Sequence, residues 1–129
     1  MAAPGKGIPM VAQGAISKYQ ALMVGTAYPQ VKVTTGANVA VIGYAVNDAD
    51  DGQEISIVPV SSGQVTKAIA GADIARGKPV MAEGADGRLK EYAASTTAQH
   101  GAGIALEGGA DGQFINILTA YWFGCSALT

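Results

Sequence analysis

Apolar and polar residues alternate along most of this chain, in short runs separated by turn residues. Such alternation over four to eight residues is typical of a β-strand with one buried face. The runs recur about every ten residues, with glycine, proline or Asp-Gly between them, which indicates an antiparallel sandwich or barrel. We therefore predict an all-β, mainly antiparallel fold with little helix. The predicted strands lie within residues 30–34, 39–46, 54–57, 64–67, 79–83, 88–92, 103–106 and 113–119.

One unit of this pattern occurs twice. An apolar run at 43–46 leads through a turn to an alternating run at 51–57, and the same sequence of features returns at 103–106 and 111–117. In both copies the turn closes with Asp-Gly, which favours tight turns because glycine takes positive φ at little cost. A third Asp-Gly, at Asp86-Gly87, predicts a hairpin. A β framework repeated without reactive groups is typical of a scaffold that packs against a partner.

The chain divides into three predicted segments. Residues 1–16 hold two prolines and three glycines. Proline lacks an N–H group and glycine loses much entropy when ordered, so we expect an extended or disordered arm outside the core. Residues 17–120 form the β domain, and residues 121–129 form an aromatic tail. Short helical turns are expected only at Ala68–Ala75 and Ala93–Gln99.

The net charge and the length of the apolar runs argue against two classes of partner, nucleic acids and membranes. The net charge of −2 is atypical of a general nucleic-acid binder. No apolar run approaches the roughly 20 residues that span a bilayer, and no signal peptide is visible, so we expect synthesis in a cytoplasm and no membrane partner. Charged residues are 14% of the chain, below the roughly 25% of an average soluble domain. This low charge fits either a surface covered by partners or a small neutral β domain.

Two loops resemble ligand-binding motifs, but the spacing of their residues differs from the spacing that those motifs require. Gly71–Lys78 has five residues between its glycines where a phosphate loop has four, and Pro79 replaces the Ser or Thr that would reach magnesium. We predict a turn there, with Gly77 at positive φ. Asp48–Gly52 has its glycine at position 5, not 6, of a calcium loop, and Pro59 stands where the final Glu would be. We predict a solvated acidic turn.

The remaining candidates for catalytic or metal-binding residues are single residues. His100 is the only histidine, and one histidine does not make a typical zinc site. We predict a loop histidine without a catalytic role; a small hydrolase would need a Ser or Asp beside its ring. Cys125 is the only cysteine, so no intrachain disulfide forms. We therefore predict no enzyme activity, no metal and no cofactor.

Six runs of residues together resemble the small phage capsid decoration, or cement, proteins. They cover roughly residues 17–120 and comprise Val41–Ala45, Asp51–Ile57, Ala72–Val80, Gly84–Arg88, Gly103–Glu107 and Gly112–Ile117. The resemblance implies a structural virion protein, made in the host cytoplasm, that binds the major capsid protein on the outer surface of the expanded phage head and stabilises it. It also implies a homotrimer and an N-terminal arm that lies over the capsid protein. Tyr121–Thr129 extends beyond the matched pattern.

We place the predicted capsid or subunit interface in the arm and the tail. Lysine without any acidic residue marks the arm, and three consecutive aromatic residues mark the tail, where they form either a core plug or an interface anchor. An alternative function is a glycan- or surface-binding β module with Tyr121 and Trp122 as its aromatic platform. The predicted interface residues are Pro4, Lys6, Pro9, Met10, Lys18, Tyr121, Trp122 and Phe123.

Overall fold

The structure is a computed structural model that describes residues 8–37, 39–92 and 99–124. Within these ranges the chain forms ten β-strands and no helix, which confirms the all-β prediction. This part of the chain thus contains no helix long and apolar enough to cross a membrane. The strands are β1 (Ile8–Ala12), β2 (Ala21–Val24), β3 (Gln30–Val33), β4 (Gly43–Ala45), β5 (Glu54–Pro59), β6 (Val65–Ile69), β7 (Pro79–Ala82), β8 (Leu89–Glu91), β9 (Gln99–Ala105) and β10 (Phe114–Gly124).

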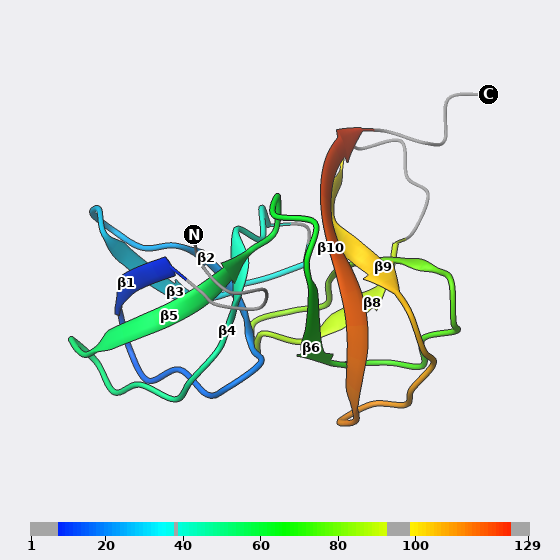
Figure 1. Ribbon diagram of the computed structural model, residues 1–129, viewed down its shortest axis with the longest axis horizontal. Coiled ribbons are helices and arrows are strands. Elements are labelled where there is room, and N and C mark those ends of the chain that lie inside the picture. Colours follow the sequence, from blue (N-terminus) through cyan, green and yellow to red (C-terminus); the bar gives the residue numbers. More distant parts are fainter. Residues whose placement is uncertain (1–7, 38, 93–98, 125–129) are drawn as a thin grey trace.

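The strands form two sheets that lie side by side (Figure 1). The first sheet is a closed barrel in the order β1-β3-β2-β4-β5, drawn on the left of the figure. The second sheet has the order β6-β10-β9-β7-β8 and lies on the right. Paired strands in both sheets are antiparallel except β1 and β3, which run parallel. The barrel and the antiparallel pairing therefore agree with the prediction.

Each sheet is one copy of the same five-strand unit. We call residues 8–60 the first unit and residues 65–124 the second unit. In the first unit β5 lies between β1 and β4, as β10 lies between β6 and β9 in the second. The parallel contact of β1 with β3 at Ala12 and Val31 returns as a single parallel bridge between Ala70 and Leu89. The repeat thus spans whole five-strand units, whereas the sequence pattern showed only the second half of each unit.

Two clusters of buried side chains form the cores. One fills the barrel and comprises Ala12, Ile16, Leu22, Val31, Ala45, Ala49, Ile55 and Ile57. The other lies in the second unit, where Ile115 and Ile117 of β10 are fully buried. This second cluster also includes four residues of the first unit, namely Ala21, Val41, Tyr44 and Val60. The two units therefore share a core.

Hydrogen bonds reinforce this shared core. The hydroxyl of Tyr44 donates to the carbonyl oxygen of Ala102 at 2.7 Å, in a fully buried setting. Burial raises the pKa of Tyr44 well above its usual value because the charged form would lose its hydration. The hydroxyl of Thr34 donates to the carbonyl oxygen of Gly84 at 2.9 Å. These bonds fix the second unit against the barrel.

The predicted arm needs a correction. Residues 8–16 do not lie outside the core, because β1 pairs with both β3 and β5 and the side chains of Ala12 and Ile16 are buried. Pro9 is tolerated in the strand because it lies outside the two residues of β1 that pair with β3. Gly14 turns the chain after the strand with a φ of 82°. Proline and glycine here shape a strand and its turn.

The predicted tail and one predicted helical turn also need correction. Tyr121 does not begin a separate tail, because β10 continues to Gly124 and stays paired with β9. Residues 125–129 lie outside the described residues. Ala68–Ala75 is not helical, since it begins in β6 and continues into bridges at Ala70 and Ile74. Most of the other predicted turn, residues 93–98, lies outside the described residues, and Gln99 begins β9.

Candidate interaction surfaces

The predicted interface residues near the N-terminus differ in location and in exposure. Pro4 and Lys6 lie outside the described residues. Pro9 is exposed on β1, whereas Met10 is half-buried and packs against the core of the barrel. Lys18 is exposed on the loop between β1 and β2. Of these residues, Pro9 and Lys18 are therefore the ones whose exposure suits a partner.

Lys18 lies at the junction of the two units. Its backbone N–H donates to Oδ1 of Asp48 at 2.7 Å, and its Nζ lies 5.2 Å from the centre of the Tyr19 ring. The Tyr19 ring in turn packs edge-on against Phe114 of β10, with 5.3 Å between ring centres. Tyr19 has a φ of 74°, a conformation that is uncommon for a bulky residue. Sequence reasoning missed Tyr19 and Phe114.

The loop that resembles a phosphate loop is a structural turn. Gly77 has a φ of 85°, as predicted, and its N–H donates to the carbonyl oxygen of Ala105. Tyr19 occupies the same place in the first unit, where its N–H donates to the carbonyl oxygen of Ala45. The two units therefore need the same left-handed turn. The first unit places a tyrosine in it.

The aromatic residues of β10 contact different neighbours. Trp122 packs on Gly101 and lies 5.3 Å from the ring of Tyr92, whereas the hydroxyl of Tyr121 lies 2.8 Å from Nδ1 of His100. A register shift between Thr119 and Trp122 marks this part of β10. Tyr121 and Trp122 therefore do not form one shared platform. The backbone of Phe123 pairs with that of His100, and its side chain lies outside the described part of the chain.

An apolar cavity of about 270 Å³ lies beside Tyr121. Most of its wall comes from the residues just before β4 and just after β5, and Tyr121 of β10 closes one side. It thus lies at the seam between the units. Its lining residues are Ala40, Val41, Ile42, Val60, Ser61 and Tyr121.

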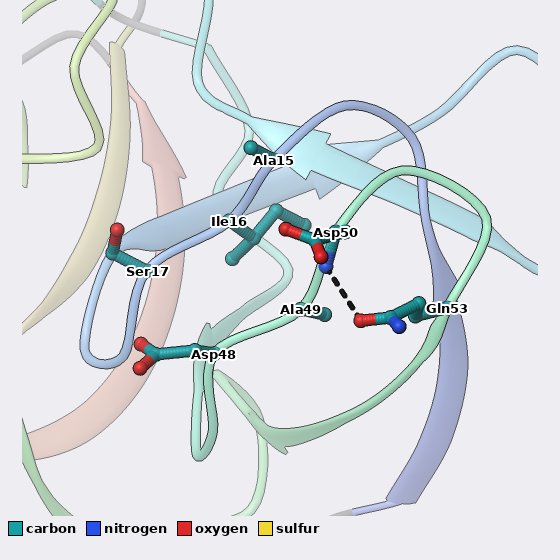
Figure 2. A pocket seen from close by; sticks show the side chains of 7 residues that line it. All are labelled: Ala15, Ile16, Ser17, Asp48, Ala49, Asp50 and Gln53. Atoms are coloured by element: carbon teal, nitrogen blue, oxygen red, sulfur yellow. Dashed lines mark hydrogen bonds between the residues drawn. The ribbon is translucent and has the colours of Figure 1, made fainter.

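A second cavity of about 250 Å³ lies on the barrel (Figure 2). Asp48 and Asp50 stand on its rim, and the backbone N–H of Asp50 donates to Oε1 of Gln53 at 2.9 Å. Among the described residues, no group of three or more His, Cys, Asp or Glu side chains could hold a metal ion. The remaining lining residues are Ala15, Ile16, Ser17 and Ala49.

The outer face of the second sheet carries a group of apolar side chains that sequence reasoning also missed. Phe114 is 57% exposed, Val65 53% and Leu106 41%. Strand register places the group on one face, because residues directly opposite each other in a ladder point to the same side. We call this surface the β10 face and define it by Val65, Lys67 and Ile69 of β6, Phe114, Asn116 and Leu118 of β10, and Ile104 and Leu106 of β9 and its end.

Comparisons with known proteins find a similar fold among the solved structures. No protein-family model and no curated protein matches this chain. Among solved structures, the chain is similar to the N base of the head fiber gp8.5 in bacteriophage phi29, with a TM-score of 0.66 and 21% sequence identity. The similarity covers 88% of this chain and 92% of that chain. At this level of identity the similarity shows a common fold, which includes both units.

Proposed function

We propose that this protein is a structural protein of a phage virion. The observation that carries the proposal is the fold shared with the N base of a phage head fiber over 88% of the chain. The sequence resemblance to capsid decoration proteins supports the same role independently. We further propose that the protein binds the major capsid protein on the outer surface of the expanded head and stabilises the shell, after synthesis in the host cytoplasm.

The best candidate for the shell-binding surface is one end of the barrel. Tyr28 is 92% exposed and Val24 is 59% exposed, both at the β2–β3 hairpin. Because β1 runs parallel to β3, with Val11 opposite Gln30, the exposed Ile8 lies toward the same end. Exposed aromatic and aliphatic residues of this kind anchor protein interfaces. The end also includes the start of the described chain, near the predicted arm.

We propose no catalytic role. The imidazole of His100 contacts the hydroxyl of Tyr121, an arrangement that orients side chains along β9 and β10. The glycan-binding alternative is not carried forward, because its platform needs Tyr121 and Trp122 on one surface and they contact different neighbours. The homotrimer implied by the resemblance stays a prediction.

The test mixes purified protein with undecorated expanded heads. We expect the protein to co-sediment with the heads and to raise their resistance to rupture. Tyr28→Ser should lower the affinity for heads at least about tenfold, since a buried aromatic anchor typically contributes 2 kcal/mol or more. Arg76→Ser, on an exposed loop of the second unit, is the matched control and should bind as wild type. Failure of the wild-type protein to bind heads would refute the proposal.

A further inference from the structure

The apolar cavity at the seam between the units, which we call the seam cavity, lies next to the proposed shell-binding end of the barrel. Continuing the register of β2 with β4 places the exposed Val24 level with Val41 in the cavity wall. Ile8 lies opposite Ile57 of β5, and three residues further on, about 10 Å at the spacing of a strand, the chain reaches Val60 in the same wall. The seam cavity and the shell-binding end therefore adjoin.

The combined surface is built from segments without charged residues. None of these segments contains Asp, Glu, Lys or Arg, and they are residues 8–10, 23–30, 39–42, 58–64 and 119–124. At the opposite end of the barrel, by contrast, Glu54 begins β5 after three aspartates in the preceding loop. Covering a charge without pairing it costs free energy, and the centres of protein interfaces are accordingly depleted of charged residues. A partner of this surface should therefore be apolar or neutral where it makes contact.

The end of β10 adds an open strand edge beside the seam cavity. β6 pairs with β10 as far as Leu118, and the N–H of Thr119 still donates to the carbonyl oxygen of Gln64. From residue 120 to residue 124, the described strands pair with β10 on one side only, through β9. Tyr121 of this segment lines the seam cavity and is 46% exposed. Within the described part of the chain, a strand edge open to pairing thus lies next to an apolar hollow.

We propose that an extended, uncharged segment of the major capsid protein adds a strand to this edge of β10 and places one apolar side chain in the seam cavity. In strand addition the backbone hydrogen bonds give affinity, and a pocket for a side chain gives selectivity. The cavity of about 270 Å³ is smaller than the roughly 300–1,000 Å³ of small-molecule sites, which suits a single large side chain. The capsid protein is the fitting occupant because the cavity adjoins the end that binds it in the proposed function, on which this inference rests.

The first experiment fills the cavity. Ala40 is an exposed residue of the cavity wall, so Ala40→Trp should occupy the hollow and lower the affinity for undecorated expanded heads at least about tenfold. Ala110→Trp, on the exposed turn before β10, is the matched control and should bind as wild type. Circular dichroism checks that both variants are folded. Equal binding of Ala40→Trp and the wild type would overturn the inference and leave the proposed function intact, whereas a wild-type protein that does not bind heads would overturn both.

The second experiment uses the wild-type protein and measures backbone hydrogen exchange with and without heads. The amides that face the open edge within residues 120–124 should exchange at least about tenfold more slowly on heads, because the added strand accepts their hydrogen bonds. Ile117 and Leu118 pair with strands on both sides and are the internal control, with unchanged exchange. Unchanged exchange of 120–124 on heads would overturn the inference. Slower exchange of 120–124 in the isolated protein at high concentration would do the same, since the occupant would then be a second copy.

Discussion

Tyr44 shows how one residue joins the two units. It belongs to a strand of the first unit, and its side chain is completely buried in the core of the second. Its hydroxyl finds a partner in the carbonyl oxygen of Ala102, so the core contains a tyrosine without an unpaired donor. The equivalent position in the second unit is Ile104, which carries no polar group. The polar atom of Tyr44 therefore serves the contact between the units.

Tyr44→Phe should lower the free energy of unfolding by about 1–3 kcal/mol, because the Ala102 carbonyl then stays buried without its donor. Urea denaturation followed by circular dichroism measures the change. Tyr28→Phe is the control: that ring is 92% exposed, and its hydroxyl should contribute less than about 0.5 kcal/mol. Equal stabilities of Tyr44→Phe and the wild type would show that the hydrogen bond contributes nothing net.

Tyr19 explains why half of the repeat is hard to see in the sequence. Its left-handed turn is filled by glycine in the second unit, at Gly77, so the pairs Lys18-Tyr19 and Arg76-Gly77 look unrelated. A tyrosine at this φ costs of order 1–3 kcal/mol. The edge-on contact with Phe114 offsets part of that cost, since aromatic pairs contribute about 0.5–1.5 kcal/mol.

At the scale of elements, alternation predicted the strands that have one buried and one more exposed face. β5, β6 and β10 were found in this way. β1 and β2 were missed. In β1 the glycine- and proline-rich surroundings of Ile8–Ala12 suggested disorder, and burial between β3 and β5 overrides that local preference. Burial of this kind depends on residues distant in sequence, which no local pattern contains.

The interaction surfaces were harder to predict than the strands. The sequence drew attention to Tyr121 and Trp122 because aromatic residues are few. It gave no sign of the β10 face, since its members come from three strands and look like ordinary alternation in each. Only strand register assembles Val65, Phe114 and Leu106 into one surface.

The β9–β10 ladder depends on a glycine at one close contact. A methyl group at Gly101 would overlap the indole of Trp122. Gly101→Ala should therefore displace the indole and destabilise the fold by about 1–3 kcal/mol. Trp122 is the only tryptophan, so its fluorescence emission reports the displacement directly. Gly84→Ala meets no atom within 4 Å and is the matched control. An unchanged emission spectrum for Gly101→Ala would contradict the close packing.

At the scale of the molecule, the barrel is closed by its first strand. β1 pairs with two strands and adds Ala12 to the core. A deletion at the N-terminus is therefore expected to affect folding, because removing residues 1–16 takes away β1 together with the buried Ile16.

Deletion of residues 1–16 should abolish cooperative thermal unfolding of the first unit, since the barrel then lacks one strand and two core side chains. Deletion of residues 1–7 leaves every described contact of β1 in place and should preserve the transition. Circular dichroism during heating compares the two truncated proteins. If the longer deletion melts like the wild type, β1 is not needed for the barrel.

The shared core also sets an order of events on the ribosome. Residues of the first unit leave the exit tunnel before those of the second, and its barrel core can close without any later residue. The row of Ala21, Tyr44 and Val58 stays uncovered at that moment, because the side chains that cover it have not been made. A nascent chain that stalls after the first unit has emerged, but before the second unit has, would therefore present an apolar surface to neighbouring chains on the same messenger RNA.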